Sequence, residues 1–307
     1  RGLGDVYKRQ LLNILIVGGG ATGIEVAGIL SEMKKFVLPN DYPDMPSSLM
    51  HIYLIEAGPR LLAGMSEESS AHAEQFLREM GVNILLNKRV VDYRDHKVVL
   101  EDGTEIATRT FIWVSGVTGV TIGNLDASLI GRGGRIKVDS FNRVEGMNNV
   151  FAIGDQCIQV ADEDYPNGHP QLAQVAIQQG ELLAKNLVRM EKGREMKPFH
   201  YRNLGSMATV GRNRAVAEFS KVKMQGWFAW VMWLVVHLRS ILGVRNKVIV
   251  LLNWVWNYFT YDQSMRMIVY ARKAKEIRDR EKVEETTHWG KELVQEEKNP
   301  SITSSSK

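Results

Sequence analysis

The feature that most constrains the fold is an apolar run that passes directly into a glycine-rich turn. Residues 14–23 read I-L-I-V-G-G-G-A-T-G, and a helical pattern follows. In a strand–turn–helix unit, Gly18 permits a sharp turn, Gly20 leaves room for a pyrophosphate, and Gly23 lets the helix pack closely on the strand. The pattern therefore predicts a dinucleotide-binding unit, with a glycine turn in some other α/β domain as the alternative.

The second half of this fingerprint is an acid at the end of the next strand. Residues 51–56 read H-I-Y-L-I-E and place Glu56 there. Glu56 comes later than the usual spacing of about 20 residues, and the proline-containing loop 39–46 accounts for the extra length. A carboxylate at this point accepts hydrogen bonds from ribose hydroxyls and repels a 2′-phosphate. The sequence therefore predicts a preference for NAD over NADP.

Composition excludes several classes of protein. The 307 residues, 44% hydrophobic and 24% charged, are typical of a globular chain with room for two domains. One cysteine, Cys157, excludes a disulfide framework and a Cys-x-x-Cys redox pair. The seven histidines show no metal-ligand spacing, so no metal is predicted. The net charge of +4 comes without a zinc-finger or RNA-recognition signature, which favours anionic lipid or simple solubility over nucleic acid.

Strand-like and helix-like segments alternate from residue 11 to residue 138. We expect a dinucleotide-binding domain over 11–131, with a small antiparallel meander that turns at Asp102-Gly103. The expected strands are 11–17, 52–56, 82–86, 90–93, 97–100, 105–108 and 111–114, and the expected helices are 22–36 and 66–80. Residues 1–10 lack an apolar core and are predicted to be a non-native lead.

Residues 132–192 look like the closing piece of a second nucleotide-binding fold. A buried strand is expected over 150–153, ending in Gly154-Asp155, and a helix over 170–190. The opening strand–turn–helix of such a fold is absent from the sequence. We therefore expect the chain to be truncated at its N-terminus.

The composition changes again over residues 193–270, where five of the seven tryptophans lie between Trp227 and Trp256. The apolar runs 227–236 and 248–252 are too short to cross the ~30 Å hydrocarbon core of a membrane. Basic residues near their join suit an anionic membrane surface, so an interfacial anchor is predicted, with two core helices of a soluble domain as the alternative. The charged and Ser-rich residues 271–307 are predicted to be partly disordered.

Taken with these motifs, the chain resembles type II NADH dehydrogenases, the single-subunit, non-proton-pumping NADH:quinone oxidoreductases. Residues 172–179, L-A-Q-V-A-I-Q-Q, are similar to that family's A-Q-x-A-x-Q-Q quinone-site motif, and residues 199–217 and 226–233 also resemble it. The resemblance implies an α/β flavoprotein with two dinucleotide-binding domains, of the glutathione-reductase type. The family's glycine motif for the FAD pyrophosphate has no counterpart here, so the chain alone is expected to hold no FAD and to be inactive.

The resemblance also implies roles for single residues. Glu25 is placed near the nicotinamide and the quinone, although a first-turn acid favoured by the helix dipole is an equal alternative. Asp155 is assigned to the FAD ribitol, with a turn cap as its alternative. The residues expected at the NADH site are Gly18, Gly20, Thr22, Gly23, Glu56 and Gly116.

The glutamine motif has a physical interpretation as well. Gln174 and Gln178 are one helical turn apart, so both amides project from one face. Ala173 and Ala176 are small enough for a planar ring to approach the backbone. Neutral amides can hydrogen-bond quinone carbonyls without opposing reduction by a charge, and a polar surface helix is the alternative.

These observations predict an enzyme that passes hydride from NADH to FAD and then two electrons to a membrane quinone. It is expected to be a peripheral protein on the cytoplasmic face of the inner membrane, with a homodimer left open. Two other functions stay open: a soluble NAD-dependent flavin reductase, and a membrane-bound NAD-binding protein without enzymatic activity.

Overall fold

The structure is a computed structural model that describes residues 12–41, 43, 47–120, 122–220 and 222–260. The predicted lead (1–10) and the predicted tail (271–307) lie outside the described residues. The chain divides into two units, Arg1–Val255 and Trp256–Lys307. All elements below belong to the first unit, apart from the last residues of α7.

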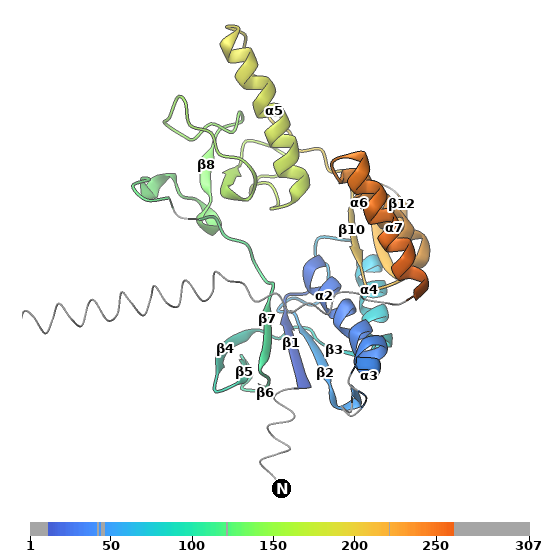
Figure 1. The fold of residues 1–307 in the computed structure, drawn as a ribbon. Coiled ribbons are helices and arrows are strands. Elements are labelled where there is room, and N and C mark those ends of the chain that lie inside the picture. Colours follow the sequence, from blue (N-terminus) through green and yellow to red (C-terminus); the bar gives the residue numbers. More distant parts are fainter. Residues whose placement is uncertain (1–11, 42, 44–46, 121, 221, 261–307) are drawn as a thin grey trace, which may run out of the picture. The chain divides into compact units, whose positions relative to one another are not determined.

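The N-terminal half is built on a parallel sheet with strand order β3-β2-β1-β7 (Figure 1). The strands are β1 (Asn13–Val17), β2 (His51–Ile55), β3 (Val82–Leu85) and β7 (Thr110–Trp113). Helix α2 (Ala21–Glu32) follows β1, and α4 (Glu67–Glu79) lies between β2 and β3. A π-helical segment, η1 (Met33–Val37), the short helix α3 (Leu38–Asp41) and the 3-10 turn η2 (Ser47–Leu49) complete the crossover to β2. The carboxyl ends of β1, β2 and β7 lie at one edge because these strands are parallel neighbours.

Both faces of this sheet are buried, as side-chain alternation along β1 requires. Leu15 and Val17 pack with Val98 and Leu100 of an antiparallel meander. The meander consists of β4 (Val90–Arg94), β5 (Lys97–Leu100) and β6 (Glu105–Ala107). Ile16 faces the opposite core with Ile24 of α2. The predicted parallel sheet and meander are therefore confirmed, including a turn at Gly103, which has φ +83°.

The middle of the chain departs from the predicted strand over 150–153. Phe151 makes only an isolated antiparallel bridge with Arg143, and Val150 is 47% exposed. Val144 N donates to Val150 O at 2.9 Å and Ala152 N donates to Asn142 O at 3.0 Å, so the pairing is a single bridge and forms no strand over 150–153. The elements of this region are η3 (Ala127–Leu129), η4 (Arg132–Gly134), β8 (Ile136–Val138), η5 (Gly154–Gln156), β9 (Cys157–Gln159) and α5 (Ala173–Glu191), with β8 and β9 paired in parallel.

A three-stranded antiparallel sheet, which the sequence pattern did not predict, precedes the C-terminal helices. It consists of β10 (Ser206–Thr209), β11 (Ala215–Phe219) and β12 (Val222–Gln225). Ala215 and Ala217 pack against Ala229 of α6 (Gly226–Ser240), which is followed by α7 (Val244–Thr260). None of the helices in the described ranges is long and apolar enough to cross a membrane.

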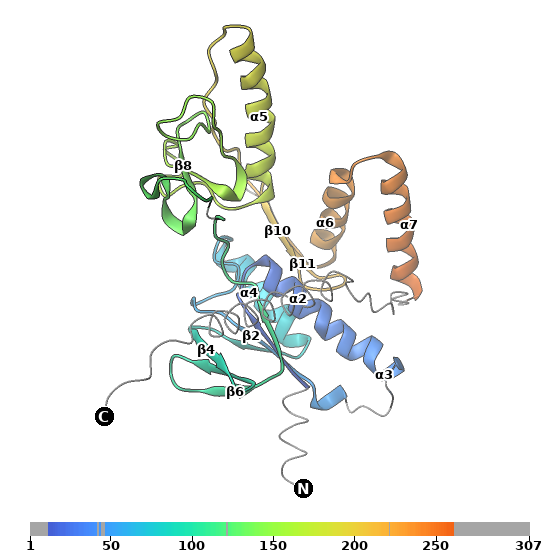
Figure 2. The ribbon, with the colours of Figure 1, turned by 60° about the vertical axis from the view of Figure 1, so that its left-hand side comes forward.

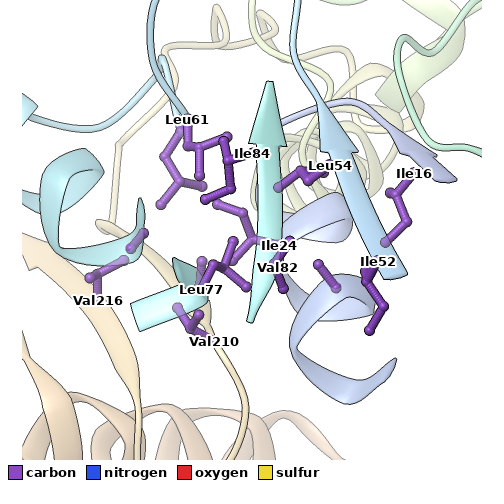
Figure 3. Packing of buried hydrophobic residues seen from close by; sticks show 14 of the residues in the cluster. Ile16, Ile24, Ile52, Leu54, Leu61, Leu77, Val82, Ile84, Val210 and Val216 are labelled. Carbon is purple, nitrogen blue, oxygen red and sulfur yellow. The ribbon is translucent and has the colours of Figure 1, made fainter. Parts of the chain in front are cut away.

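The C-terminal sheet shares the core of the dinucleotide-binding half. Ala208, Val210 and Val216 are fully buried in the same cluster as Ile24 and Leu77 (Figure 3). The predicted domain boundaries at 131/132 and 192/193 stay predictions, but this core combines residues from before the first boundary and after the second. The C-terminal sheet therefore helps to hold α2 and α4 on the parallel sheet.

Helix α2 contacts this sheet through one strip of residues at helical spacing. A Cβ at Gly28 would lie 2.9 Å from the backbone nitrogen of Gly211 and 2.9 Å from the carbonyl carbon of Val210. Glu25 accepts a hydrogen bond from Thr209 N at 3.4 Å, and Glu32 accepts one from the backbone N–H of Arg212. The absence of a side chain at Gly28 thus allows α2 to lie close to the C-terminal sheet. The carboxylates of Glu25 and Glu32 then bond the helix to the backbone of that sheet.

A second carboxylate contact links the C-terminal sheet to α4. Ser66 is the N-cap of α4, and its side chain accepts from Ser69 N. Glu218 of β11 accepts from Ser66 N at 3.0 Å and also from the Ser66 hydroxyl. Burial opposes ionisation of Glu218, but the hydrogen bonds from Ser66 and Ser69 outweigh it, so the pKa of this carboxyl is lowered.

We expect Glu218→Gln to make the stability of the chain less dependent on acid. A lowered pKa means that the carboxylate stabilises the fold above its ordinary pKa of 4.5 and that this contribution disappears as the pH falls further. At pH 7 the variant should lose about 1 kcal/mol of unfolding free energy, a value already discounted for solvent screening. Urea unfolding at pH 7 and pH 3 measures this, with the exposed Glu101→Gln as control. An equal difference from the unchanged chain at both pH values would contradict the prediction.

Candidate functional site

The glycine turn has the geometry that its spacing predicts. Gly18 has φ +118°, and its N–H donates to Ile55 O at 2.9 Å. A Cβ at Gly23 would lie only 1.8 Å from Gly18 O, whereas a Cβ at Gly20 would meet nothing within 4 Å. Gly18 and Gly23 are therefore needed for the turn itself, and Gly20 keeps open the space above it.

The N-terminus of α2 is available to an anion. Gly20 is the N-cap and provides no side-chain cap for the first N–H groups of the helix. Gly20, Ala21 and Thr22 are all exposed. Uncapped N–H groups at the positive end of a helix dipole are an anion-binding arrangement, and the Thr22 hydroxyl adds a further donor there.

Glu56 closes this site from the neighbouring strand. Its Oε2 accepts from Gly19 N at 2.5 Å, and its Oε1 accepts from Gly58 N at 2.7 Å. These two bonds fix the carboxylate against the glycine turn. The nearest arginine along the chain is Arg60. Its guanidinium donates to the carbonyl groups of Ala63 and Met65 and is therefore engaged with the backbone.

Gly116 lies on the third strand end of the same edge. It follows β7, has φ +82°, and a Cβ there would meet nothing within 4 Å. The preceding residue, Ser115, contacts the Gly18 position, where a Cβ would lie 3.1 Å from Ser115 Cα. The structure therefore brings the predicted residues Gly18, Gly20, Thr22, Gly23, Glu56 and Gly116 to one edge of the sheet.

Glu25 lies beyond this edge, on the side of α2 that faces β10. The first turn of α2 contains no acid, so the interpretation of Glu25 as a first-turn dipole residue is wrong. Its bond to Thr209 N instead fastens the helix to the C-terminal sheet. The predicted nearness of Glu25 to a nicotinamide and a quinone stays a prediction.

Asp155 is an exposed residue of η5, and its carboxylate has no hydrogen-bond partner among the residues that the structure describes. The turn around it is rigid. Gly154 N donates to Gln179 Oε1 at 2.6 Å, and Gln156 makes two bonds with the backbone of Val120, at 2.6 and 2.8 Å. A free carboxylate on a fixed turn is suited to accept hydrogen bonds from ligand hydroxyls.

The motif glutamines project from one face of α5, as their spacing predicts, but their amides already have protein partners. Gln174 Nε2 donates to Gly205 O at 2.8 Å, and Gln178 Nε2 donates to Arg202 O at 2.9 Å. Gln178 Oε1 accepts from Arg202 N at 3.0 Å. Each amide keeps one N–H, and the predicted role of both glutamines toward a quinone stays a prediction. Ala173, at the start of α5, is exposed.

A buried acid–imidazole pair, which contacts the segment before β10, was not found from the sequence. Asp162 Oδ2 lies 3.0 Å from His169 Nε2, and both side chains are 4% exposed. Burial opposes ionisation of Asp162, but bonds from His169, Tyr201 N and Asp164 N outweigh it and lower its pKa. The residues lie in a loop without periodicity, so no sequence signal marked them. Their arrangement is structural, since it orders the backbone at Tyr201.

No cluster of three or more His, Cys, Asp or Glu side chains within the described ranges has the arrangement of a metal site. The polar groups gathered at the sheet edge are instead backbone N–H groups and one carboxylate. That donor set suits a phosphate-bearing ligand with ribose hydroxyls.

Comparison with protein families gives two matches along the chain. The pyridine nucleotide-disulphide oxidoreductase model matches residues 4–180, and the NDH2 C-terminal domain model matches residues 203–261. The second match covers the sheet β10–β12 and both C-terminal helices. The first match spans both the predicted NADH domain and most of the segment 132–192, so the predicted domain boundaries stay predictions.

Curated proteins similar to this chain include type II NADH:quinone oxidoreductases. Two type II NADH:quinone oxidoreductases of Mycobacterium tuberculosis, NdhA and Ndh, are 34% identical over 260 residues and 31% identical over 264 residues. These alignments cover 80% and 82% of this chain but 54% and 56% of the relatives. The chain thus spans about half the length of the curated relatives it matches.

A solved structure supports the fold. NDH2 from Plasmodium falciparum in complex with NADH superposes with a TM-score of 0.74, at 19% identity, over 82% of this chain and 67% of that one. This confirms the predicted α/β flavoprotein fold. The family model alone covers more than half of the residues. The chain therefore belongs to the pyridine nucleotide-disulphide oxidoreductase family and, within it, to the type II NADH dehydrogenases.

Proposed function

We propose that this chain carries the NADH site and the quinone-facing helix of a non-proton-pumping NADH:quinone oxidoreductase. The observation that carries the proposal is a combination of two features in one chain. The Glu56 carboxylate is bonded to the glycine turn, and the same chain matches the NDH2 C-terminal domain model further on. Two curated relatives that align with 80% and 82% of this chain are named type II NADH:quinone oxidoreductases. A nucleotide-binding domain alone would support only NAD binding.

At the sheet edge, the described residues have distinct tasks toward NADH. The first N–H groups of α2 and the Thr22 hydroxyl would bind the pyrophosphate above the open Gly20. Glu56 would accept hydrogen bonds from the adenosine ribose hydroxyls. Gly116 would leave room for the dinucleotide to cross the end of β7. Together these residues bind and orient NADH.

The residues present also fit one contact to FAD. The Asp155 carboxylate is exposed and fixed in position by the bonds of Gly154 and Gln156, as an acceptor for ribitol hydroxyls requires. When bound, the flavin supplies hydride acceptance from NADH and two-electron transfer to the quinone. The contribution of the chain is to bind and orient its partners and to exclude water.

The quinone is proposed to lie along the N-terminal end of α5. Each of Gln174 and Gln178 keeps one N–H that can donate to a quinone carbonyl. Ala173 offers a small surface beside them, and the neighbouring apolar side chains of Leu172, 42% exposed, and Leu204, 55% exposed, suit a ring with an isoprenoid tail. Glu25 would act from α2 as a residue near the nicotinamide and quinone.

The C-terminal helices are proposed to bind an anionic membrane surface from the cytoplasmic side of the inner membrane. Trp227, Phe228 and Val235 of α6 are 49%, 70% and 56% exposed, and Leu242 in the turn after it is 87% exposed. Exposed arginines at positions 239 and 245 flank this turn. Aromatic rings at the headgroup level and cations near anionic lipid favour a peripheral position.

The function is tested by NADH oxidation with the protein expressed from the full reading frame that contains this sequence. We expect oxidation that depends on a quinone, that increases for long-tailed quinones when anionic vesicles are present, and that moves no protons across the vesicle membrane. Oxidation only with soluble flavin as acceptor would favour a flavin reductase. Binding of NADH without any oxidation would favour a non-enzymatic NAD-binding protein.

A further prediction concerns the choice of dinucleotide. Glu56 should repel a 2′-phosphate, and Arg60 is bonded to backbone carbonyls, so NADH should bind more tightly than NADPH. Glu56→Gln removes the charge but keeps one acceptor, and we expect the preference to fall about tenfold, mainly through better NADPH binding. Calorimetric titration measures the two affinities, with Glu68→Gln at an exposed position of α4 as control. Equal affinities of the unchanged chain for both dinucleotides would exclude this role.

A further inference from the structure

Helix α5 carries three side-chain amides that pair with one extended segment, residues 197–205, here called the strap. The strap leads from α5 into β10 and runs beside the helix (Figure 2). The three amides belong to Gln174, Gln178 and Asn186. They are separated by four and by eight residues, about one and two helical turns, so they share a face.

Two of these amides pair with the strap backbone in both directions. Asn186 Nδ2 donates to Lys197 O at 2.8 Å, and its Oδ1 accepts from Lys197 N at 2.9 Å. Gln178 bonds in the same way with Arg202, at 2.9 and 3.0 Å. Such a pair satisfies one backbone N–H and one C=O, as a neighbouring strand would do.

The third amide extends the pattern toward the quinone-facing end of the helix. Gln174 Nε2 donates to Gly205 O at 2.8 Å, while its Oε1 accepts from Leu204 N at 3.3 Å and from the Tyr201 hydroxyl at 3.2 Å. Helix and strap run antiparallel, since Lys197 meets the C-terminal end of α5 and Gly205 meets the N-terminal end. Side-chain amides therefore take the place of a strand along the strap.

The strap is also held from its other side. Phe199 N donates to Ser140 O at 2.7 Å, and Tyr201 N donates to Asp162 Oδ2 at 3.1 Å. The strap backbone is thus bonded to α5 and also to two groups outside α5, the Ser140 carbonyl and the Asp162 carboxylate. A strap bonded on two sides has a fixed path, and the amides that pair with it have fixed planes.

We propose that Asn186 is a positioning residue that, through the strap, sets the orientation of the Gln178 and Gln174 amides toward the quinone. The inference rests on the proposed function, because the quinone is taken as the partner of the remaining N–H of each glutamine. An amide whose plane is already fixed loses less rotamer freedom on binding. Asn186 is 1% exposed and lies two turns or more from the quinone-facing end, so it acts without touching the ligand.

The first test uses the 307-residue chain and hydrogen exchange of the strap. In Asn186→Asp at pH 7.5 the carboxylate cannot donate to Lys197 O, and we expect the Lys197 and Arg202 amides to exchange about tenfold faster. Position 186 is 1% exposed, and such burial raises the pKa of a carboxyl placed there. Once protonated, the carboxyl again has one donor and one acceptor, so protection should return as the pH is lowered, relative to the unchanged chain at each pH. Ala184→Asp, which adds the same charge on the exposed side of α5, is the control. Gln178→Glu makes the same amide-to-carboxylate change at a less buried position, and the exchange of the strap amides is measured in the same way.

The second measurement titrates the same variants with NADH and with ubiquinone carrying one isoprene unit. We expect Asn186→Asp to weaken quinone binding about fivefold or more at pH 7.5, with binding recovering as the pH is lowered, and to leave NADH binding unchanged. Unchanged strap exchange, or faster exchange with unchanged quinone affinity, would overturn the positioning role. If the unchanged chain binds NADH but no quinone, the proposed function fails together with this role, while the exchange data still decide whether the amide pairing exists.

Discussion

Replacing Gly23 by alanine is expected to weaken NADH binding strongly and to destabilise the glycine turn. A Cβ at this position would lie 1.8 Å from Gly18 O, a backbone atom that cannot move without breaking the turn. Gly18 N is bonded to Ile55 O, so a shift would also disturb the end of β2, next to Glu56. We expect a loss of roughly a hundredfold or more in NADH affinity and about 3 kcal/mol in unfolding free energy.

A matched variant separates loss of the site from loss of the fold. Gly20 has φ −74°, which alanine adopts freely, and a Cβ there meets nothing within 4 Å. Gly20→Ala should therefore keep the stability of the unchanged chain but weaken NADH binding, because its methyl group would occupy the space left for the pyrophosphate. Calorimetric titration and urea unfolding measure both quantities. Normal NADH affinity in Gly23→Ala would mean that the turn differs from the one described.

The parts of the fold that could be predicted are those whose spacing is fixed by local geometry. Gly18, Gly20 and Gly23 occupy positions that a strand–turn–helix unit dictates, and Glu56 ends the adjacent parallel strand. The helix over 66–80 was equally visible, because Ser66 is an N-cap and Gly81 ends the pattern with φ +82°. Each of these signals lies within a few residues of the feature that it specifies.

The C-terminal sheet could not be predicted because its sequence is shaped by contacts with distant segments. Strand β11 contains Ala215 and Ala217, residues of low strand propensity that are small because α6 packs directly on them. Ala208, Val210 and Val216 complete a core whose other buried members precede residue 90. The hydrophobic periodicity and the strand propensity of a segment carry no information about partners that are distant in the sequence.

The glutamine motif was half predictable for the same reason. Helical spacing correctly places Gln174 and Gln178 on one face, since that depends only on the helix. The partners of their amides lie in a strap without periodicity, 24 residues or more along the chain. Asn186 and the Asp162–His169 pair escaped notice because only burial distinguishes them from ordinary polar residues.

The second large effect is expected at Gly28, in the interior of α2. Gly→Ala in a helix interior ordinarily stabilises a protein by about 0.5–1 kcal/mol. Here a Cβ would lie 2.9 Å from Gly211 N and 2.9 Å from the carbonyl carbon of Val210, both of them backbone atoms. We therefore expect the opposite sign for Gly28→Ala, a loss of about 1–3 kcal/mol, and a larger loss for Gly28→Val.

The loss should be specific to the contact between α2 and the C-terminal sheet. Moving β10 away from the helix would lengthen the bonds that Glu25 and Glu32 accept from the sheet backbone, and would open the core around Val210. Gly180→Ala in α5 is the matched control, because the nearest atom to its Cβ is Ile153 Cδ1 at 3.7 Å, an ordinary contact. Urea unfolding should show Gly180→Ala at least as stable as the unchanged chain and Gly28→Ala clearly below it. If both variants gained stability alike, the close approach at Gly28 would not exist in solution, and the C-terminal sheet would not be docked on the dinucleotide-binding half in this way.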